Sequence, residues 1–147
     1  MTTYIELVLP AKLMELLASG VWPSEERDLQ RQNLEQIVSL EAVRRVAPDE
    51  NALVLFPPPF ETIATRIERG ELFWTWPEAA PSQIDPEKTL LIGDFGLVSD
   101  TGLVLDYRET GEPKVLRLRW HFPNPEENNK WEQVSPTLAD FCKAIGL

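Results

Sequence analysis

The stretch LVLDYRETGEPKVLRLR, residues 103–119, contains two alternating runs on either side of a polar turn. In each run, large apolar residues alternate with charged or smaller ones, and glutamate, threonine, glycine and glutamate separate the runs. This pattern is typical of two antiparallel strands joined by a short loop. We therefore expect a β-hairpin formed by Leu103 to Arg108 and Lys114 to Arg119.

A loop of four residues would fix the register of this hairpin. Leu105 would then face Leu116, and Leu103 would face Leu118, which places the large apolar side chains on one face of the sheet. Asp106 falls on the opposite face, together with the charged side chains Arg117 and Arg119. We interpret Asp106 as a cross-strand charge partner on a polar face and not as a catalytic acid.

The rest of the chain predicts helices around further strands, and residues 1–147 are expected to form one domain. Helical spacing and capping residues predict helices over Pro10–Ser19, in two or three pieces within Ser24–Val46, from Glu61 to Gly70, and after Ser135. Apolar runs predict strands at Ala52–Phe56, Glu71–Trp76 and Thr89–Ile92, with an ordered acidic loop before the last of these. The fold class is therefore α+β, with a mostly antiparallel central sheet flanked by N-terminal helices and a C-terminal helix.

Two tripeptides near the hairpin match the active-site strings of known enzymes. Asp94-Phe95-Gly96 matches the magnesium-binding string of protein kinases, but the chain lacks a glycine-rich phosphate loop, a strand lysine and an HRD-type loop. Asp100-Thr101-Gly102 matches the catalytic loop of aspartic proteases, and a homodimer could supply a second aspartate. Ser99 to Gly102 nevertheless has ordinary turn composition, so we interpret Asp100 as structural. A hydrolase that uses Asp100 is the weakest of the functional hypotheses.

The composition limits the classes of partner. The formal net charge of -10 at pH 7 disfavours direct nucleic-acid binding and favours a basic protein partner. Cys142 is the only cysteine, and the N-terminus lacks the features of a signal peptide, so we expect a cytoplasmic protein without membrane contact. His121, the sole histidine, has no metal-spaced partner and is interpreted as a surface or partly packed side chain. No catalytic residue, metal or cofactor is predicted.

The candidate binding residues are two tryptophans and the acidic residues that follow them. If Glu71–Trp76 is a strand, Trp74 and Trp76 lie on one face and could form an aromatic platform in a cleft. The predicted binding set adds three carboxylates from the acidic segment and comprises Trp74, Trp76, Glu78, Asp85 and Glu87.

The order of several short strings resembles the SUKH superfamily, the Smi- and Knr-type proteins. The strings are FPPPF at 56–60, IGDFGLVSDTGLVLDYR at 92–108, VLRLRW at 115–120, and the terminal NKWEQVSPTLADFCKAIGL with its single tryptophan. The resemblance spans about Ala52 to Leu147, and it implies an α+β domain without catalytic residues. Many bacterial members are immunity proteins that neutralise polymorphic toxins, often nucleases, while fungal members regulate cell-wall synthesis.

The sequence therefore supports two functional hypotheses besides the hydrolase. The first is a non-enzymatic immunity protein, which would bind a basic toxin domain through charge and aromatic anchors. The alternative is a small-ligand or peptide-binding regulatory domain of Smi/Knr type, with Trp74 and Trp76 as its platform. Neither hypothesis predicts an oligomeric state.

Overall fold

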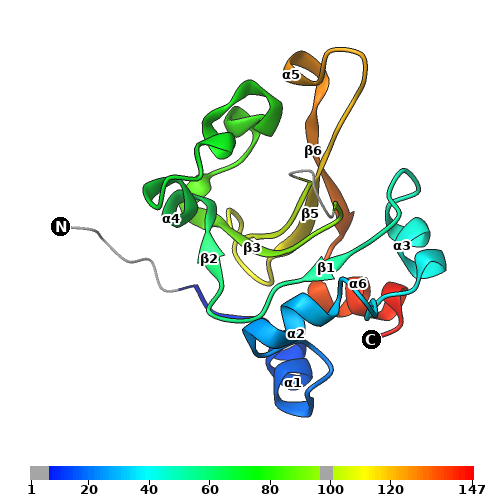
Figure 1. The fold of residues 1–147 in the computed structure, drawn as a ribbon. Coiled ribbons are helices and arrows are strands. Elements are labelled where there is room, and N and C mark those ends of the chain that lie inside the picture. Colours follow the sequence, from blue (N-terminus) through cyan, green and yellow to red (C-terminus); the bar gives the residue numbers. More distant parts are fainter. Residues whose placement is uncertain (1–6, 97–100) are drawn as a thin grey trace.

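The strands form a single antiparallel sheet in a computed structural model that describes residues 7–96 and 101–147 (Figure 1). Its order is β1-β3-β4-β5-β6, and β2 pairs with β3 beside β1. The strands are β1 (Val54–Leu55), β2 (Glu61–Thr62), β3 (Thr89–Asp94), β4 (Gly102–Asp106), β5 (Lys114–Arg119) and β6 (Lys130–Ser135). The predicted α+β class with an antiparallel central sheet is confirmed.

Helices lie on both sides of this sheet. The α-helices are α1 (Ala11–Ser19), α2 (Glu26–Arg31), α3 (Leu40–Val46), α4 (Ile63–Glu68), α5 (Pro125–Asn128) and α6 (Leu138–Ile145). Four single 3-10 turns follow α4, namely η1 (Leu72–Thr75), η2 (Pro77–Ala79), η3 (Pro81–Gln83) and η4 (Pro86–Lys88). Figure 1 shows α1, α2, α3 and α6 gathered at one side of the sheet, whereas α4 and the turns after it lie at the other.

Local capping explains where two of the helices begin. The hydroxyl of Ser39 accepts a hydrogen bond from the Ala42 amide at 3.2 Å and caps α3. Thr137 caps α6 by accepting from the Asp140 amide at 3.1 Å, so the terminal helix starts after Thr137 and not at the predicted cap Ser135. Side-chain oxygens at these positions satisfy amides that have no partner within the helix.

The sheet separates two apolar cores. The first core packs α1, α3 and α6 against one face, and it contains Leu103, Leu105 and Val115. The second core packs α4 and the η turns against the other face, and it contains Val104 and Leu116. All five residues of β4 are buried, so this central strand is covered on both faces.

The predicted hairpin exists, but its register is wrong by one residue. Val104 lies opposite Leu116, and Leu105 lies opposite Val115, so Leu105 and Leu116 are on opposite faces of the sheet. A shift of one residue moves every side chain of a strand to the other face. The prediction assumed one apolar and one polar face, whereas both faces of β4 and β5 are buried.

Asp106 also has a different partner from the one predicted. Its carboxylate binds the guanidinium of Arg108 with bonds of 2.9 to 3.1 Å, and Arg108 donates to the Gln83 carbonyl at 2.9 Å. Lys114 is the residue opposite Asp106 in the sheet. Asp106 therefore fixes the end of β4 against η3, and it is not a cross-strand partner of an arginine.

Arg117 lies on the first-core side of the sheet within a cluster of charges. Its side chain is 1% exposed, and it donates to Asp49 at 2.6 Å and to Glu132 at 2.9 Å. Burial raises the pKa of the Asp49 carboxyl, but the hydrogen bond and the charge of Arg117 outweigh burial, so this pKa lies below its ordinary value. The cluster joins the segment after α3 to β5 and to the edge strand β6.

The side-chain amides of two glutamines occupy the outer edges of the sheet. Gln32 donates to the Leu55 carbonyl and accepts from the Leu55 amide, both at 2.8 Å, at the free side of β1. Gln83 accepts from the Trp131 amide at 2.9 Å and donates to the Asn129 carbonyl at 3.3 Å, at the free side of β6. Each amide takes the place of a neighbouring strand at this position.

The structure describes all of Asp94-Phe95-Gly96 but only the last two residues of Asp100-Thr101-Gly102. Asp94 ends β3, and its carboxylate accepts from the Gly96 amide at 2.7 Å and from the Thr101 hydroxyl at 3.0 Å. These bonds make Asp94-Phe95-Gly96 a turn at the end of the strand. Asp100 lies outside the described residues, so its structural role stays a prediction.

Candidate functional site

Four aromatic side chains form a continuous, partly exposed surface, which we call the aromatic face: Trp76 and Phe122 are exposed, whereas Phe73 and Trp120 are half-buried. The ring of Phe73 lies edge-on to Trp76 at 5.9 Å and is stacked on Trp120 at 6.3 Å, with the two ring planes 4° apart. Trp120 in turn contacts Phe122 at 6.3 Å. Trp76 is 53% exposed, Phe122 is 77% exposed, and the neighbouring Leu72 is 58% exposed. Such large apolar side chains in one exposed group are typical of a binding surface.

The predicted platform of Trp74 and Trp76 is wrong, because residues 71–76 are not a strand. Pro77 follows directly, and the segment closes into η1, in which the Trp76 amide donates to the Phe73 carbonyl at 2.9 Å. The two tryptophans consequently point in different directions. Trp74 is 5% exposed and belongs to the second core, whereas Trp76 lies on the aromatic face.

Trp74 supports the aromatic face from below. Its ring lies edge-on to Phe73 at 5.1 Å and contacts Trp131 at 6.2 Å. The Trp131 indole donates to the Ala79 carbonyl at 2.7 Å, which holds that ring against η2. Gly102 provides the space for Trp74, since a Cβ atom at this position would lie 3.0 Å from the Trp74 ring.

Asn129 connects the elements that carry the aromatic face, although sequence reasoning missed it. It is 3% exposed, and its amide accepts from the His121 backbone at 2.8 Å and donates to the Glu78 carbonyl at 2.8 Å. His121 is half-buried, as predicted. Asn129 thus joins the chain after β5 to η2, and a long-range contact of this kind leaves no periodic signal in the sequence.

Acidic side chains lie beside the aromatic face. Glu78 is half-buried on η2, and Glu126 and Glu127 are exposed on α5, which packs against η2. In Figure 1, α5 and the η turns lie at the end of the molecule away from α1. The aromatic face is therefore bordered by negative charge, on a chain whose formal net charge is -10.

Asp85 and Glu87 do not join the other predicted binding residues. The carboxylate of Asp85 accepts from the Glu87 amide at 3.1 Å and caps η4, while its carbonyl accepts from the Thr89 hydroxyl at 2.7 Å. Glu87 lines a separate cavity beside α4. The five predicted binding residues are thus divided among the second core, the aromatic face, a turn and this cavity.

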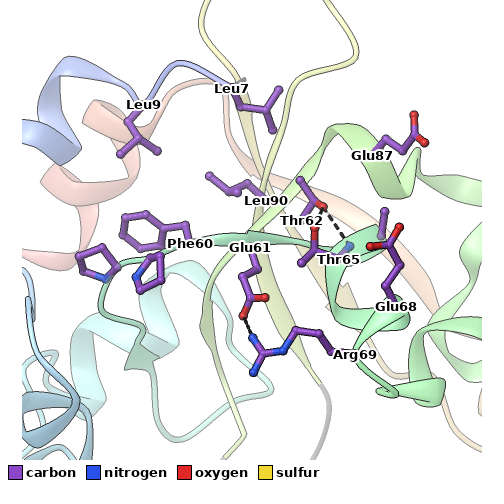
Figure 2. Close-up of a pocket in the computed structure, with 13 residues that line it drawn as sticks. Leu7, Leu9, Phe60, Glu61, Thr62, Thr65, Glu68, Arg69, Glu87 and Leu90 are labelled. Carbon is purple, nitrogen blue, oxygen red and sulfur yellow. Dashed lines mark hydrogen bonds and ion pairs between the residues drawn. The ribbon is translucent and has the colours of Figure 1, made fainter. Parts of the chain in front are cut away.

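The cavity beside α4, which we call the β2–α4 pocket, has a volume of about 620 Å³ (Figure 2). Figure 2 shows Leu9 and Phe60 at one end, and Glu68 and Glu87 at the opposite end. Both residues of β2 line the pocket, together with Leu7, Leu9, Pro58, Pro59, Phe60, Ala64, Thr65, Glu68, Arg69, Glu87 and Leu90. The pocket therefore has an apolar end and an acidic end.

No family model matches the chain, and neither the curated proteins nor the solved structures compared with it match it. The resemblance to the SUKH superfamily accordingly stays a prediction. Within residues 7–96 and 101–147, no helix is both long and apolar enough to cross a membrane. In the same residues, no group of three or more histidine, cysteine, aspartate or glutamate side chains is placed to hold a metal ion.

Proposed function

We propose that this chain is a non-enzymatic binding domain of immunity type, which neutralises a basic toxin domain by covering it with the aromatic face. The observation that carries the proposal is the stack of Trp76, Phe73, Trp120 and Phe122 beside acidic residues, in which Trp76 and Phe122 are exposed. The role in immunity rests on the SUKH resemblance, and the surface and the charge of the partner rest on this stack and on the acidic composition.

The aromatic rings and the charges would contribute to different steps of binding. Aromatic side chains that become buried at the centre of an interface commonly dominate its affinity, and they mainly slow dissociation. Opposite net charges attract the partners over distance and mainly raise the association rate. The alternative, a small-ligand or peptide-binding regulator of Smi/Knr type, relied on a platform formed by two tryptophans. Trp74 is buried, so this platform does not support the alternative.

The test begins with the partner that co-purifies from the native cell, identified and then produced as a pure domain. Wild-type chain should restore the growth of cells that express this domain, whereas the double variant Trp76→Ala/Phe122→Ala should not. Leu34→Ala is the matched control, because Leu34 is 94% exposed in the segment between α2 and α3 and is outside the aromatic face. A partner whose toxicity is unaffected by the wild-type chain would refute the immunity role.

Binding kinetics test the surface separately. Added salt should slow association at least about tenfold, since screening weakens attraction between exposed charges. Trp76→Ala should speed dissociation about 30-fold, which corresponds to the loss of about 2 kcal/mol of affinity. If salt left association unchanged and the substitution left dissociation unchanged, the assignment of this surface would be wrong.

A further inference from the structure

We infer that the β2–α4 pocket binds an extended peptide segment in which apolar side chains are followed by basic ones. The inference rests on the juxtaposition of an apolar end, an acidic end and an edge strand in one pocket. It does not depend on the aromatic face, so it can succeed or fail independently of the proposed function.

The apolar end is formed by side chains at the margin of the first core. Leu7, Leu9 and Phe60 are half-buried and pack against that core, and Leu90 is 5% exposed at the base of the pocket. An apolar group of a ligand would extend this core outward and lose contact with water, which favours binding. The volume of about 620 Å³ lies within the range typical of ligand pockets.

At the acidic end, carboxylates outnumber cationic groups among the described lining residues. Among the described lining residues, Arg69 supplies one guanidinium, which binds Glu61, as the dashed line in Figure 2 shows. Arg66 approaches Glu61 at 3.6 Å. Glu68 and Glu87 are exposed and have no ion-pair partner among the described residues. The lining thus carries three carboxylates against one guanidinium, which favours a cationic group and repels an anionic one.

The strand β2 favours a peptide over a simple amine. It has one neighbour among the described strands, β3, with Glu61 opposite Leu91 and Thr62 opposite Leu90. Both residues of β2 line the pocket, so a segment bound there would lie alongside this short strand. Peptides that bind in this way gain affinity from main-chain hydrogen bonds and specificity from side-chain pockets.

The probe is a blocked hexapeptide with two leucines followed by two lysines between terminal glycines, titrated into the protein by calorimetry at low salt. Ala64→Trp would place an indole in the pocket and should weaken binding at least about tenfold. Glu68→Lys/Glu87→Lys changes only exposed side chains and should weaken binding at least about fivefold. Glu112→Lys is the matched control, because Glu112 is exposed in the β4–β5 turn, and it should change binding less than about twofold.

The outcomes separate this site from the aromatic face. Loss of binding in both pocket variants, with normal binding in Glu112→Lys and in Trp76→Ala, supports the inference. No binding at about 1 mM peptide overturns it, as does an unchanged affinity in Glu68→Lys/Glu87→Lys. If Trp76→Ala lost as much peptide affinity as the pocket variants, the peptide would bind on the aromatic face. If hexylammonium ion bound as tightly as the hexapeptide, recognition of the peptide main chain would be excluded. If Ala64→Trp does not fold, the charge-reversal variant decides the question.

Discussion

Replacing Gln32 by leucine should destabilise the fold more than the same replacement of Gln83. Both side chains make two hydrogen bonds to the backbone at an edge of the sheet, and Gln32 also donates to the Asp28 carbonyl at 3.3 Å. Gln32 is 1% exposed, whereas Gln83 is exposed. The partner of Gln32 is Leu55, which is fully buried. The pair of substitutions therefore varies burial while the change of side chain stays the same.

The expected losses in the free energy of unfolding depend on whether the backbone groups that each glutamine amide binds can find another hydrogen-bond partner. In Gln32→Leu, the amide and the carbonyl of Leu55 lose their partners away from water, and each such group costs about 1–3 kcal/mol. The leucine recovers part of this loss by apolar contact, so we expect the free energy of unfolding to fall by about 2–4 kcal/mol. In Gln83→Leu, water can bind the exposed Trp131 amide, and the bond that the Asn129 carbonyl loses is the longer one at 3.3 Å, so the expected loss is smaller, about 1 kcal/mol.

Urea unfolding followed by far-ultraviolet circular dichroism measures both losses. The unfolding midpoint should decrease for Gln32→Leu with an unchanged slope, because the native fold and the surface exposed on unfolding stay the same. Equal losses for the two variants would refute the argument from burial. A loss below about 1 kcal/mol for Gln32→Leu would show that the Leu55 backbone groups find other partners.

Three further predictions concern the charge cluster and the aromatic face. Arg117→Leu should lower the free energy of unfolding by about 2 kcal/mol or more in urea unfolding at pH 7, because it removes a buried guanidinium that holds Asp49 and Glu132. The pKa of Asp49 is lowered in the folded state, so its contribution to stability is present above its ordinary pKa of 3.8 and is lost as pH falls below that value. Asp49→Asn should therefore reduce the difference in urea midpoint between pH 7 and pH 3, and an unchanged difference would contradict this role. Gly102→Ala should cost about 1–3 kcal/mol in the same assay and alter the near-ultraviolet dichroism, because its Cβ would lie 3.0 Å from the Trp74 ring and 3.1 Å from the Leu91 side chain.

Local signals predicted the helices better than they predicted the contacts between strands. The first helix runs from Ala11 to Ser19 between Pro10 and Gly20, close to its predicted limits, because a proline and a left-handed glycine mark its ends. The helix expected to begin at Glu61 begins at Ile63, because Glu61 and Thr62 pair with β3. A pairing with a strand about 30 residues away leaves no local signal.

The errors in the sheet have a common physical cause. The predicted register assumed that the alternating residues of β4 divide into a buried face and an exposed face. Both faces of β4 are buried, so this assumption led to a register that is wrong by one residue. Leucine, phenylalanine and tryptophan at 72–76 have high strand propensity, yet the space above Gly102 and the proline at 77 favour η1. The glutamines at the sheet edges were missed for a similar reason, since Gln32 and Leu55 are 23 positions apart.

The candidate site was predicted in part. Trp76 is exposed as a binding residue must be, and Glu78 lies on the turn beside it. Phe73, Trp120 and Phe122 were not predicted as part of one surface, because the return of the chain after β5 brings them together. Whether this surface binds a partner remains a prediction for the kinetic experiments.

The different exposure of the tryptophans makes the two surfaces optically distinguishable. Of the five indoles, Trp22 is fully buried and Trp74 nearly so, while Trp76 is the most exposed. A partner that covers Trp76 should shift the emission of the unlabelled protein to shorter wavelength and protect it from quenching by acrylamide. The β2–α4 pocket has no tryptophan in its lining, so a peptide bound there should leave this fluorescence nearly unchanged. The native chain therefore carries a fluorescent reporter for one surface and not for the other.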